Sequence, residues 1–272
     1  MLHKNEIILS LQESYHRMNY IDTHTHLYDE AFEGEKAESV TRAIESGVCK
    51  MILPDIDSST RKSMFSLAAE FPGILFPSIG LHPTSINSEW KKEIEQLEEN
   101  TGTEIYAIGE TGMDCYWSKE FLNEQKEAFE YQLHMADRLS LPVIVHSREA
   151  TEPIFDILEK CRHLNLKGVF HAYSGSFETF ERLQKYGDWY IGIGGVVTYK
   201  NASIAETVKK IPAERILLET DSPYLTPVPK RGSRNESSYI HYIAEKIAIQ
   251  KGIDKEEIAT ITSENARKLF II

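Results

Sequence analysis

The segment IDTHTHL, near the start of the chain, contains two histidines separated by one residue, His24 and His26. Alternate side chains of a β-strand point to the same side, so both imidazoles can reach one point. Two imidazoles aimed at one point suit a transition-metal ion. Alone the pair is a weak signal, because His-x-His also occurs by chance.

Four further candidate ligands share this placement, because each ends or closely follows a short β-branched segment. They are Glu110, His146, His171 and Asp221. In a parallel barrel the carboxyl ends of the strands converge on one mouth, where active sites lie. Six nitrogen and oxygen ligands exceed the four of one tetrahedral zinc ion, so the set predicts two metal ions with a carboxylate such as Glu110 between them. Unrelated structural roles for all six are a poor alternative, since burying these groups together without metal is costly.

The elements that position these residues are short apolar segments alternating with amphipathic ones. Strand-like segments are 20–24, 49–54, 75–80, 105–110, 142–146, 168–171, 189–193 and 215–219. Helix-like segments with apolar residues three or four apart are 35–46, 58–71, 88–99, 121–139, 151–161, 177–186, 203–210 and 236–250. This order predicts an α/β fold, a (β/α)₈ TIM-type barrel. A doubly wound sheet competes, but its usual GxGxxG and GxxxxGK[ST] signatures are missing.

The chain lacks a linker-like segment that would divide it, so we expect one barrel domain over residues 1–272. Residues 1–18 are expected to form an N-terminal extension, a helix or strand that caps the bottom of the barrel. After Asp254 we expect short C-terminal helices packed on the barrel, one of them beginning at Ser263.

Composition limits the class of partner. Lys and Arg total 30 against 42 Asp and Glu, giving a net charge of -12, the wrong sign for a protein that holds nucleic acid by a global basic field. An anionic substrate must therefore be held locally, by a few cations or by bound metal. The three cysteines lack metal-site or disulfide spacing, and no segment is long enough to span a bilayer, so we expect a cytoplasmic protein without membrane contact.

As an ordered set, the motifs resemble the TatD family of metal-dependent hydrolases over nearly the whole chain, from about Tyr20 to Phe270. They are IDTHTHL at 21–27, SIGLHP at 78–83, AIGETGMD at 107–114, VIVHSREA at 143–150, FHAYSGS at 170–176, LLETDSPYLTP at 217–227, RGSRNE at 231–236 and NARKLF at 265–270. The resemblance implies a barrel of the metallo-dependent hydrolase kind, with His24, His26, Glu110, His146, His171 and Asp221 as metal ligands. It also implies deoxyribonuclease activity, often 3′ to 5′ on single strands.

The expected chemistry is hydrolysis of a phosphodiester by metal-activated water, with Glu110 between the ions and Asp221 as general base. Four imidazoles favour Zn²⁺, Mn²⁺, Co²⁺ or Ni²⁺ by affinity, whereas the resemblance suggests two divalent ions with Mg²⁺ for activity.

Substrate contacts are predicted from His82, Arg148, Arg231 and Arg234. His82 can contact a phosphate or only cap its loop, and Arg231 and Arg234 can contact phosphate or pair with nearby Glu236. Four aromatic residues in loops after strands are weaker candidates for stacking on unpaired bases: Tyr116, Trp117, Tyr173 and Tyr199.

The expected partner is DNA, as a single strand or a 3′ end, bound locally by a monomer or weak oligomer with a shallow salt dependence. A competing hypothesis is an amide or ester hydrolase on the same two-metal site, for example an aminoacyl-tRNA deacylase. A third is a barrel that binds nucleic acid or a partner without turnover.

Overall fold

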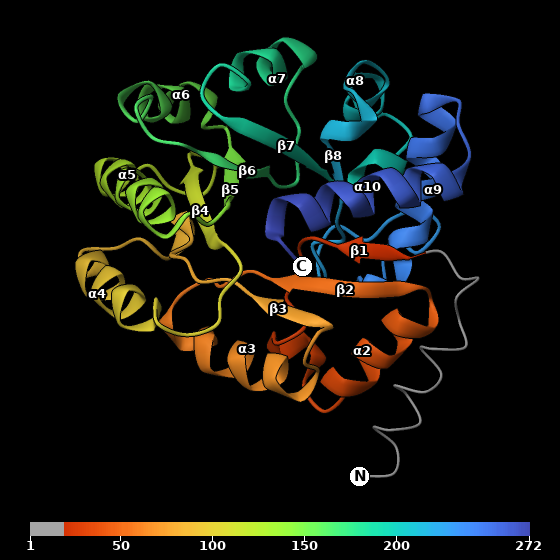
Figure 1. Ribbon diagram of the computed structural model, residues 1–272, viewed down its shortest axis with the longest axis horizontal. Helices are drawn as coiled ribbons and strands as arrows, with labels where there is room; N and C mark the ends of the chain where they lie inside the picture. The colour runs from red at the N-terminus through yellow and green to blue at the C-terminus, as the bar shows by residue number, and fades with distance from the viewer. Residues whose placement is uncertain (1–18) are drawn as a thin grey trace.

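The computed structural model describes residues 19–272, in which parallel strands alternate with helices (Figure 1). The predicted N-terminal extension, residues 1–18, lies outside the described residues. The strands are β1 (Tyr20–Asp22), β2 (Val48–Leu53), β3 (Leu75–Pro77), β4 (Ile108–Asp114), β5 (Val143–Arg148), β6 (Lys167–Phe170), β7 (Asp188–Ile193) and β8 (Ile216–Leu218). Every predicted strand segment overlaps one of them.

The strands form a closed ring. They pair in parallel in chain order, as β1 to β3 and as β4 to β8. Backbone hydrogen bonds join these two groups at both edges: Tyr106 N–H donates to Pro77 O at 2.9 Å beside β4, and Thr23 N–H donates to Leu218 O at 3.0 Å between β1 and β8. The predicted (β/α)₈ barrel is confirmed.

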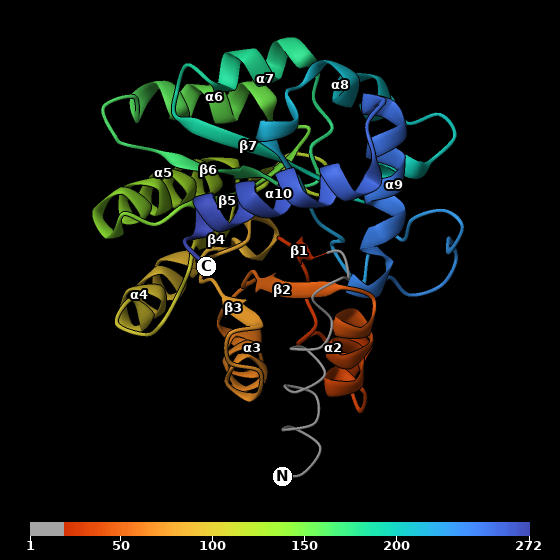
Figure 2. The ribbon, with the colours of Figure 1, turned by 45° about the vertical axis from the view of Figure 1, so that its right-hand side comes forward.

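Helices surround this ring (Figures 1 and 2). They are α2 (Lys36–Glu45), α3 (Ser58–Glu70), α4 (Trp90–Asn100), α5 (Leu122–Leu139), α6 (Thr151–Lys160), α7 (Phe177–Leu183), α8 (Ile204–Lys210), α9 (Ile240–Lys251) and α10 (Lys255–Phe270), with short 3₁₀ turns that include η2 (Pro83–Ser85). Within residues 19–272 no helix is long and apolar enough to cross a membrane.

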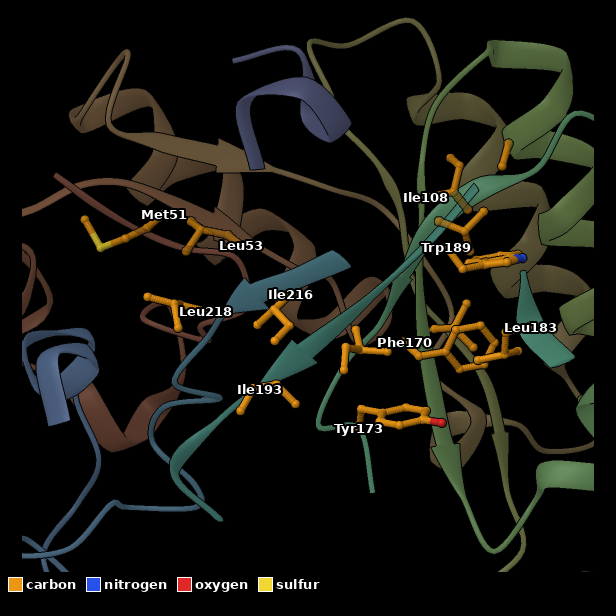
Figure 3. Packing of buried hydrophobic residues seen from close by; sticks show 14 of the residues in the cluster. Met51, Leu53, Ile108, Phe170, Tyr173, Leu183, Trp189, Ile193, Ile216 and Leu218 are labelled. Carbon is orange, nitrogen blue, oxygen red and sulfur yellow. The ribbon is translucent and has the colours of Figure 1, made fainter. Parts of the chain in front are cut away.

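Alternate residues of the strands face the helices and the barrel interior. Phe170 and Trp189 belong to the large cluster that includes residues of the helices, and Figure 3 shows them beside Leu183 of α7. Their strand neighbours Val169 and Tyr190 belong to a second, interior cluster. This cluster takes one residue from each strand or from its immediate start: Ile21, Ile52, Phe76, Ala107, Ile144, Val169, Tyr190 and Leu217.

Helix α10 closes the end of the barrel at which the strands begin. Its Ala266, Leu269 and Phe270 pack on the interior cluster, and the helix lies across the strands in both views (Figures 1 and 2). The expected helix start at Ser263 is wrong. α10 is one continuous helix that contains Ser263, and the Ser263 hydroxyl donates to Asn19 O at 2.6 Å.

Candidate metal centre

The first group of candidate ligands lies where β1 and β8 end. His24 O accepts a hydrogen bond from Asp221 N–H at 2.8 Å, which fixes the two segments side by side. The Nε2 atoms of His24 and His26 are 3.2 Å apart, and Asp221 Oδ1 lies 3.6 Å and 3.5 Å from them. Two nitrogens bound to one tetrahedral zinc ion are about 3.3 Å apart. The spacing therefore fits two ligands of a common ion.

Glu110 lies between this group and a second one. Its Oε2 is 3.2 Å from His24 Nε2 and 3.8 Å from His26 Nε2. Its Oε1 is 2.6 Å from His171 Nε2 and 3.0 Å from His146 Nδ1. The structure thus brings all six predicted ligands together, and the two Glu110 oxygens face different imidazole pairs, as a bridging carboxylate requires.

Charges within the cluster determine its protonation. Burial raises the pKa of Glu110, but the surrounding imidazoles, led by His171, outweigh it and hold this pKa well below the ordinary value. Burial and then His171 lower the pKa of His24 to about 4. Burial raises the pKa of Asp221 also, but its contacts with His26 and His24 outweigh burial and lower it. An ionised carboxylate pair beside a neutral imidazole is the donor set that a divalent cation binds.

A buried tyrosine selects the tautomer of His26. The Tyr28 hydroxyl donates to Pro54 O, so its oxygen is left to accept from His26 Nδ1–H at 2.8 Å. A neutral His26 then carries its proton on Nδ1 and has its lone pair on Nε2, the atom that faces Asp221. Tyr28 therefore leaves His26 with the tautomer that a metal ligand on Nε2 would need.

Asp114 gives comparable support to His146, and the sequence analysis did not identify this role. The predicted strand ended at Glu110, whereas β4 continues to Asp114, on the same face as Glu110. Asp114 Oδ2 is 3.0 Å from His146 Nε2, which leaves His146 Nδ1 toward Glu110. Gly112 permits this pairing of β4 with β5, because its φ is +131° and a Cβ there would lie 2.1 Å from His146 O.

Glu219 is a second carboxylate that the sequence analysis did not include among the ligands. It is fully buried, its Oε1 lies 4.0 Å from His171 Nδ1, and burial raises its pKa to about 8. Gly192 on β7 makes room, since a Cβ there would lie 1.9 Å from Glu219 Oε2. His24, His171 and Glu219 present ligand atoms within 4.8 Å of one another.

The donor set fits divalent metal ions. Buried His24 Nδ1, His171 Nδ1 and Glu219 Oε2 have no hydrogen-bond partner among the described residues. The His24 and His171 rings are stacked with centroids 4.0 Å apart, an arrangement that two protonated imidazoles would oppose. Burial lowers the pKa of His171, but Glu110 outweighs burial and raises this pKa to about 10. Cations bound beside Glu110 would neutralise the carboxylates and take the place of the His171 proton. The unpartnered Nδ1 of His171 lies on the side of Glu219.

His82 combines both predicted roles. Its Nδ1 accepts from Thr84 N–H at 3.1 Å and so caps η2. The proton of a neutral ring is therefore on Nε2, which lies 3.3 Å from Glu110 Oε1. An Nε2–H is a hydrogen-bond donor and not a metal ligand, so His82 faces the centre as a donor.

The three predicted arginines differ in their partners. Arg234 pairs with Glu35 at 2.8 Å and Glu236 at 3.0 Å, which is the structural alternative considered for it. Within residues 19–272, Arg148 and Arg231 make no ion pair with a carboxylate; their guanidinium groups lie 3.8 Å and 4.2 Å from the ring centroids of tyrosines. The latter two therefore stay available to an anionic substrate.

Comparison with known proteins identifies the family of the chain. The family model for TatD related DNase matches residues 21–271. The uncharacterized metal-dependent hydrolase YabD of Bacillus subtilis is 38% identical over 253 residues, which cover 92% of this chain and 98% of YabD. The uncharacterized metal-dependent hydrolase YcfH of Escherichia coli is 32% identical over 269 residues, covering 94% of this chain and 97% of YcfH.

A solved structure gives the same answer for the fold. The crystal structure of YjjV, a TatD homolog from Escherichia coli, superposes with a TM-score of 0.82 at 28% identity and covers 93% of this chain and 98% of that one. The family match spans all six ligand positions at the barrel mouth. This chain belongs to the TatD-related DNase family of metal-dependent hydrolases.

Proposed function

We propose that this chain is a deoxyribonuclease that hydrolyses phosphodiester bonds of DNA, acting as a 3′ to 5′ exonuclease on single-stranded ends. The placement of Glu110, with one oxygen toward His24 and the other toward His171 and His146, carries the proposal. Such an arrangement suits two divalent ions. The family supports DNA as the substrate class.

Divalent ions at this centre would supply activation of water and neutralisation of charge on the phosphoryl oxygens. The chain itself handles the proton. Asp221 lies at the edge of the cluster, with a side chain 12% exposed, and its lowered pKa keeps it ionised at neutral pH. Its carboxylate is therefore able to accept the proton of the attacking water as general base.

Two cationic or donor groups would orient the phosphate. His82 presents Nε2–H beside Glu110, and Arg148 is exposed at the end of β5, two residues after His146. A phosphoryl oxygen at the centre would accept from the first, and the guanidinium would hold a neighbouring phosphate. This local contact suits a protein with a net charge of -12.

The test is a substrate panel. Protein loaded in turn with Mg²⁺, Mn²⁺, Zn²⁺, Co²⁺ or Ni²⁺ is incubated with a labelled single-stranded oligonucleotide, the matching duplex, simple esters and an aminoacyl-RNA. We expect stepwise shortening of the single strand from its 3′ end with at least one metal. Ester or aminoacyl hydrolysis without DNA cleavage would instead identify an acyl hydrolase, and inactivity on the whole panel would favour a binding role.

A further inference from the structure

We propose that Tyr116 and Trp117, together with Arg148, form a stacking platform for an unpaired nucleobase beside the metal centre. The platform would favour single-stranded ends, because a base paired within a duplex is not free to stack on protein. The inference rests on the proposed nuclease function and adds a site that would select single-stranded over double-stranded DNA.

Exposure separates the four aromatic candidates. Tyr116 is 50% and Trp117 is 68% exposed, whereas Tyr173 is 8% exposed. The Tyr173 hydroxyl donates to Ser176 O at 2.7 Å, and the Tyr199 hydroxyl donates to Thr226 O at 3.0 Å. Tyr173 and Tyr199 therefore have structural contacts. Tyr116 and Trp117, which pack edge to face with centroids 5.0 Å apart, keep exposed aromatic surface, most of it on Trp117. Exposed apolar surface at the rim of a site indicates binding.

The platform is attached to the centre through Asp114. Its Oδ1 accepts from Tyr116 N–H at 2.9 Å and from Trp117 N–H at 3.0 Å, while its Oδ2 bonds His146. One carboxylate thus fixes both the metal-centre imidazole and the aromatic loop. A base stacked on this loop belongs to a nucleotide close to the phosphate at the centre.

Arg148 adds the charge that a nucleotide requires. Its guanidinium lies 3.8 Å from the Tyr116 ring centroid and 5.2 Å from that of Trp117. Within the described residues it has no carboxylate partner, unlike Arg234. Stacking occupies the face of a guanidinium and leaves N–H groups at its edge for phosphate oxygens.

A narrow cleft continues the platform toward His82. It has a volume of about 60 Å³, and its lining includes Trp117, Asp114 and, from η2, Pro83 and Thr84. Pro83 directly follows His82, whose Nε2 faces Glu110. The cleft therefore lies between Trp117 and the turn that follows His82. Its volume holds no more than a few small groups, so the unpaired base of a single strand would rest on the exposed Trp117 ring.

The activity test compares Trp117→Ala and Trp117→Phe on oligonucleotides that carry one abasic residue at each of the last three 3′ positions in turn. With intact oligonucleotide, Trp117→Ala is expected to lower kcat/KM by about 5- to 150-fold, the range for one stacked base. Trp117→Phe should keep most of the activity. One abasic position should remove the difference between wild type and Trp117→Ala, because the base that would stack is gone. Tyr131→Ala, an exposed aromatic on the outer helix α5, is the matched control and should have no effect.

A binding readout does not depend on turnover. Of the three tryptophans, Trp90 and Trp189 are 7% and 0% exposed, so quenching by acrylamide reports Trp117. In metal-loaded Asp221→Asn protein, a single-stranded oligonucleotide should protect Trp117 from acrylamide more than a duplex or the abasic strand does.

Equal losses on intact and abasic strands at all three positions, or no protection of Trp117, would overturn the platform. If no phosphodiester is cleaved with any metal, the nuclease function fails instead, and Trp117 protection then decides the platform alone.

Discussion

The two ends of the barrel are built from the same strands but with opposite chemistry. Where the strands begin, the interior holds an apolar layer with one residue from each strand position, closed by α10. Where they end, the interior holds His24, Glu110 and Glu219, which are at most 2% exposed. The comparison shows that the inward-facing residues of one set of strands can form an apolar layer, the floor, at one end of the barrel and a polar cluster, the mouth, at the other.

The two layers contribute opposite terms to stability. Each large apolar side chain of the floor stabilises the fold by about 1.5–3 kcal/mol when fully buried. The mouth buries carboxylates and imidazoles, which costs free energy unless they are paired or bind metal. Substitutions in the floor, the apolar layer at the start of the strands, should therefore change the free energy of unfolding without changing kcat. Substitutions at the mouth should change kcat more than the free energy of unfolding.

Asp221→Asn is expected to have the largest effect. Loss of a general base typically lowers kcat by about 10²- to 10⁴-fold. The fold and most of the metal binding should persist, because His24, His26 and Glu110 remain. Oligonucleotide hydrolysis, circular dichroism and metal analysis measure the three quantities, and near-normal turnover would remove Asp221 from the role.

Phe270→Ala tests the floor. Phe270 is 2% exposed against the interior layer, and truncation should lower the free energy of unfolding by about 3–5 kcal/mol. The kcat of the remaining folded protein should be unchanged. Urea unfolding with parallel assays checks this, with exposed Lys268→Ala in the same helix as control. A fall in kcat at full folding would show that the two ends are coupled.

Tyr28→Phe tests whether the hydrogen bond from His26 to Tyr28 contributes to metal affinity at the mouth. It removes the hydroxyl that accepts from His26 Nδ1–H, and metal affinity should fall by about 10- to 100-fold. Competition with a chromogenic chelator gives the affinity. Tyr190→Phe removes a hydroxyl from a residue of the floor and should leave the affinity unaltered. Equal affinities for wild type and Tyr28→Phe would mean that His26 needs no such partner.

Glu236→Gln should have the smallest effect and concerns the flank of the barrel. Burial raises the pKa of Glu236, but Arg42 and Arg234 outweigh it and lower this pKa below its ordinary value. A lowered folded-state pKa contributes stability above the unfolded pKa of about 4.3, and this contribution is lost as the pH falls through the folded pKa.

Because Arg42 is 38% exposed, solvent screening limits the contribution to about 1 kcal/mol or less at pH 7. The difference in melting temperature between wild type and Glu236→Gln should therefore shrink from pH 7 toward pH 3. A difference that is constant across this range would contradict the ion-pair explanation.

The sequence predicted the barrel and the convergence of the six candidate ligands because both depend on local patterns, the alternation of strands and the position of each candidate near a strand end. Asp114 was missed because the predicted strand ended at Glu110, whereas β4 continues four residues further to Asp114. Glu219 was missed because its burial depends on Gly192, a residue on a neighbouring strand.

Partners that are distant in the chain also distinguish arginines that the sequence could not tell apart. Arg231 and Arg234 were equivalent candidates in the sequence, but within residues 19–272 only Arg234 forms ion pairs, one of them with the distant Glu35 beside α2. Such contacts are set by tertiary packing and cannot be read from spacing.

The central claim, that the mouth binds two metal ions through Glu110, is tested most directly by metal stoichiometry. Wild-type and Glu110→Ala protein are saturated with Mn²⁺ or Zn²⁺, freed of excess metal and analysed by mass spectrometry beside the oligonucleotide assay. The account predicts about two ions per wild-type chain and one or fewer in Glu110→Ala, with hydrolysis lost in parallel. Full hydrolytic activity with a single ion, or unchanged stoichiometry in Glu110→Ala, would contradict it.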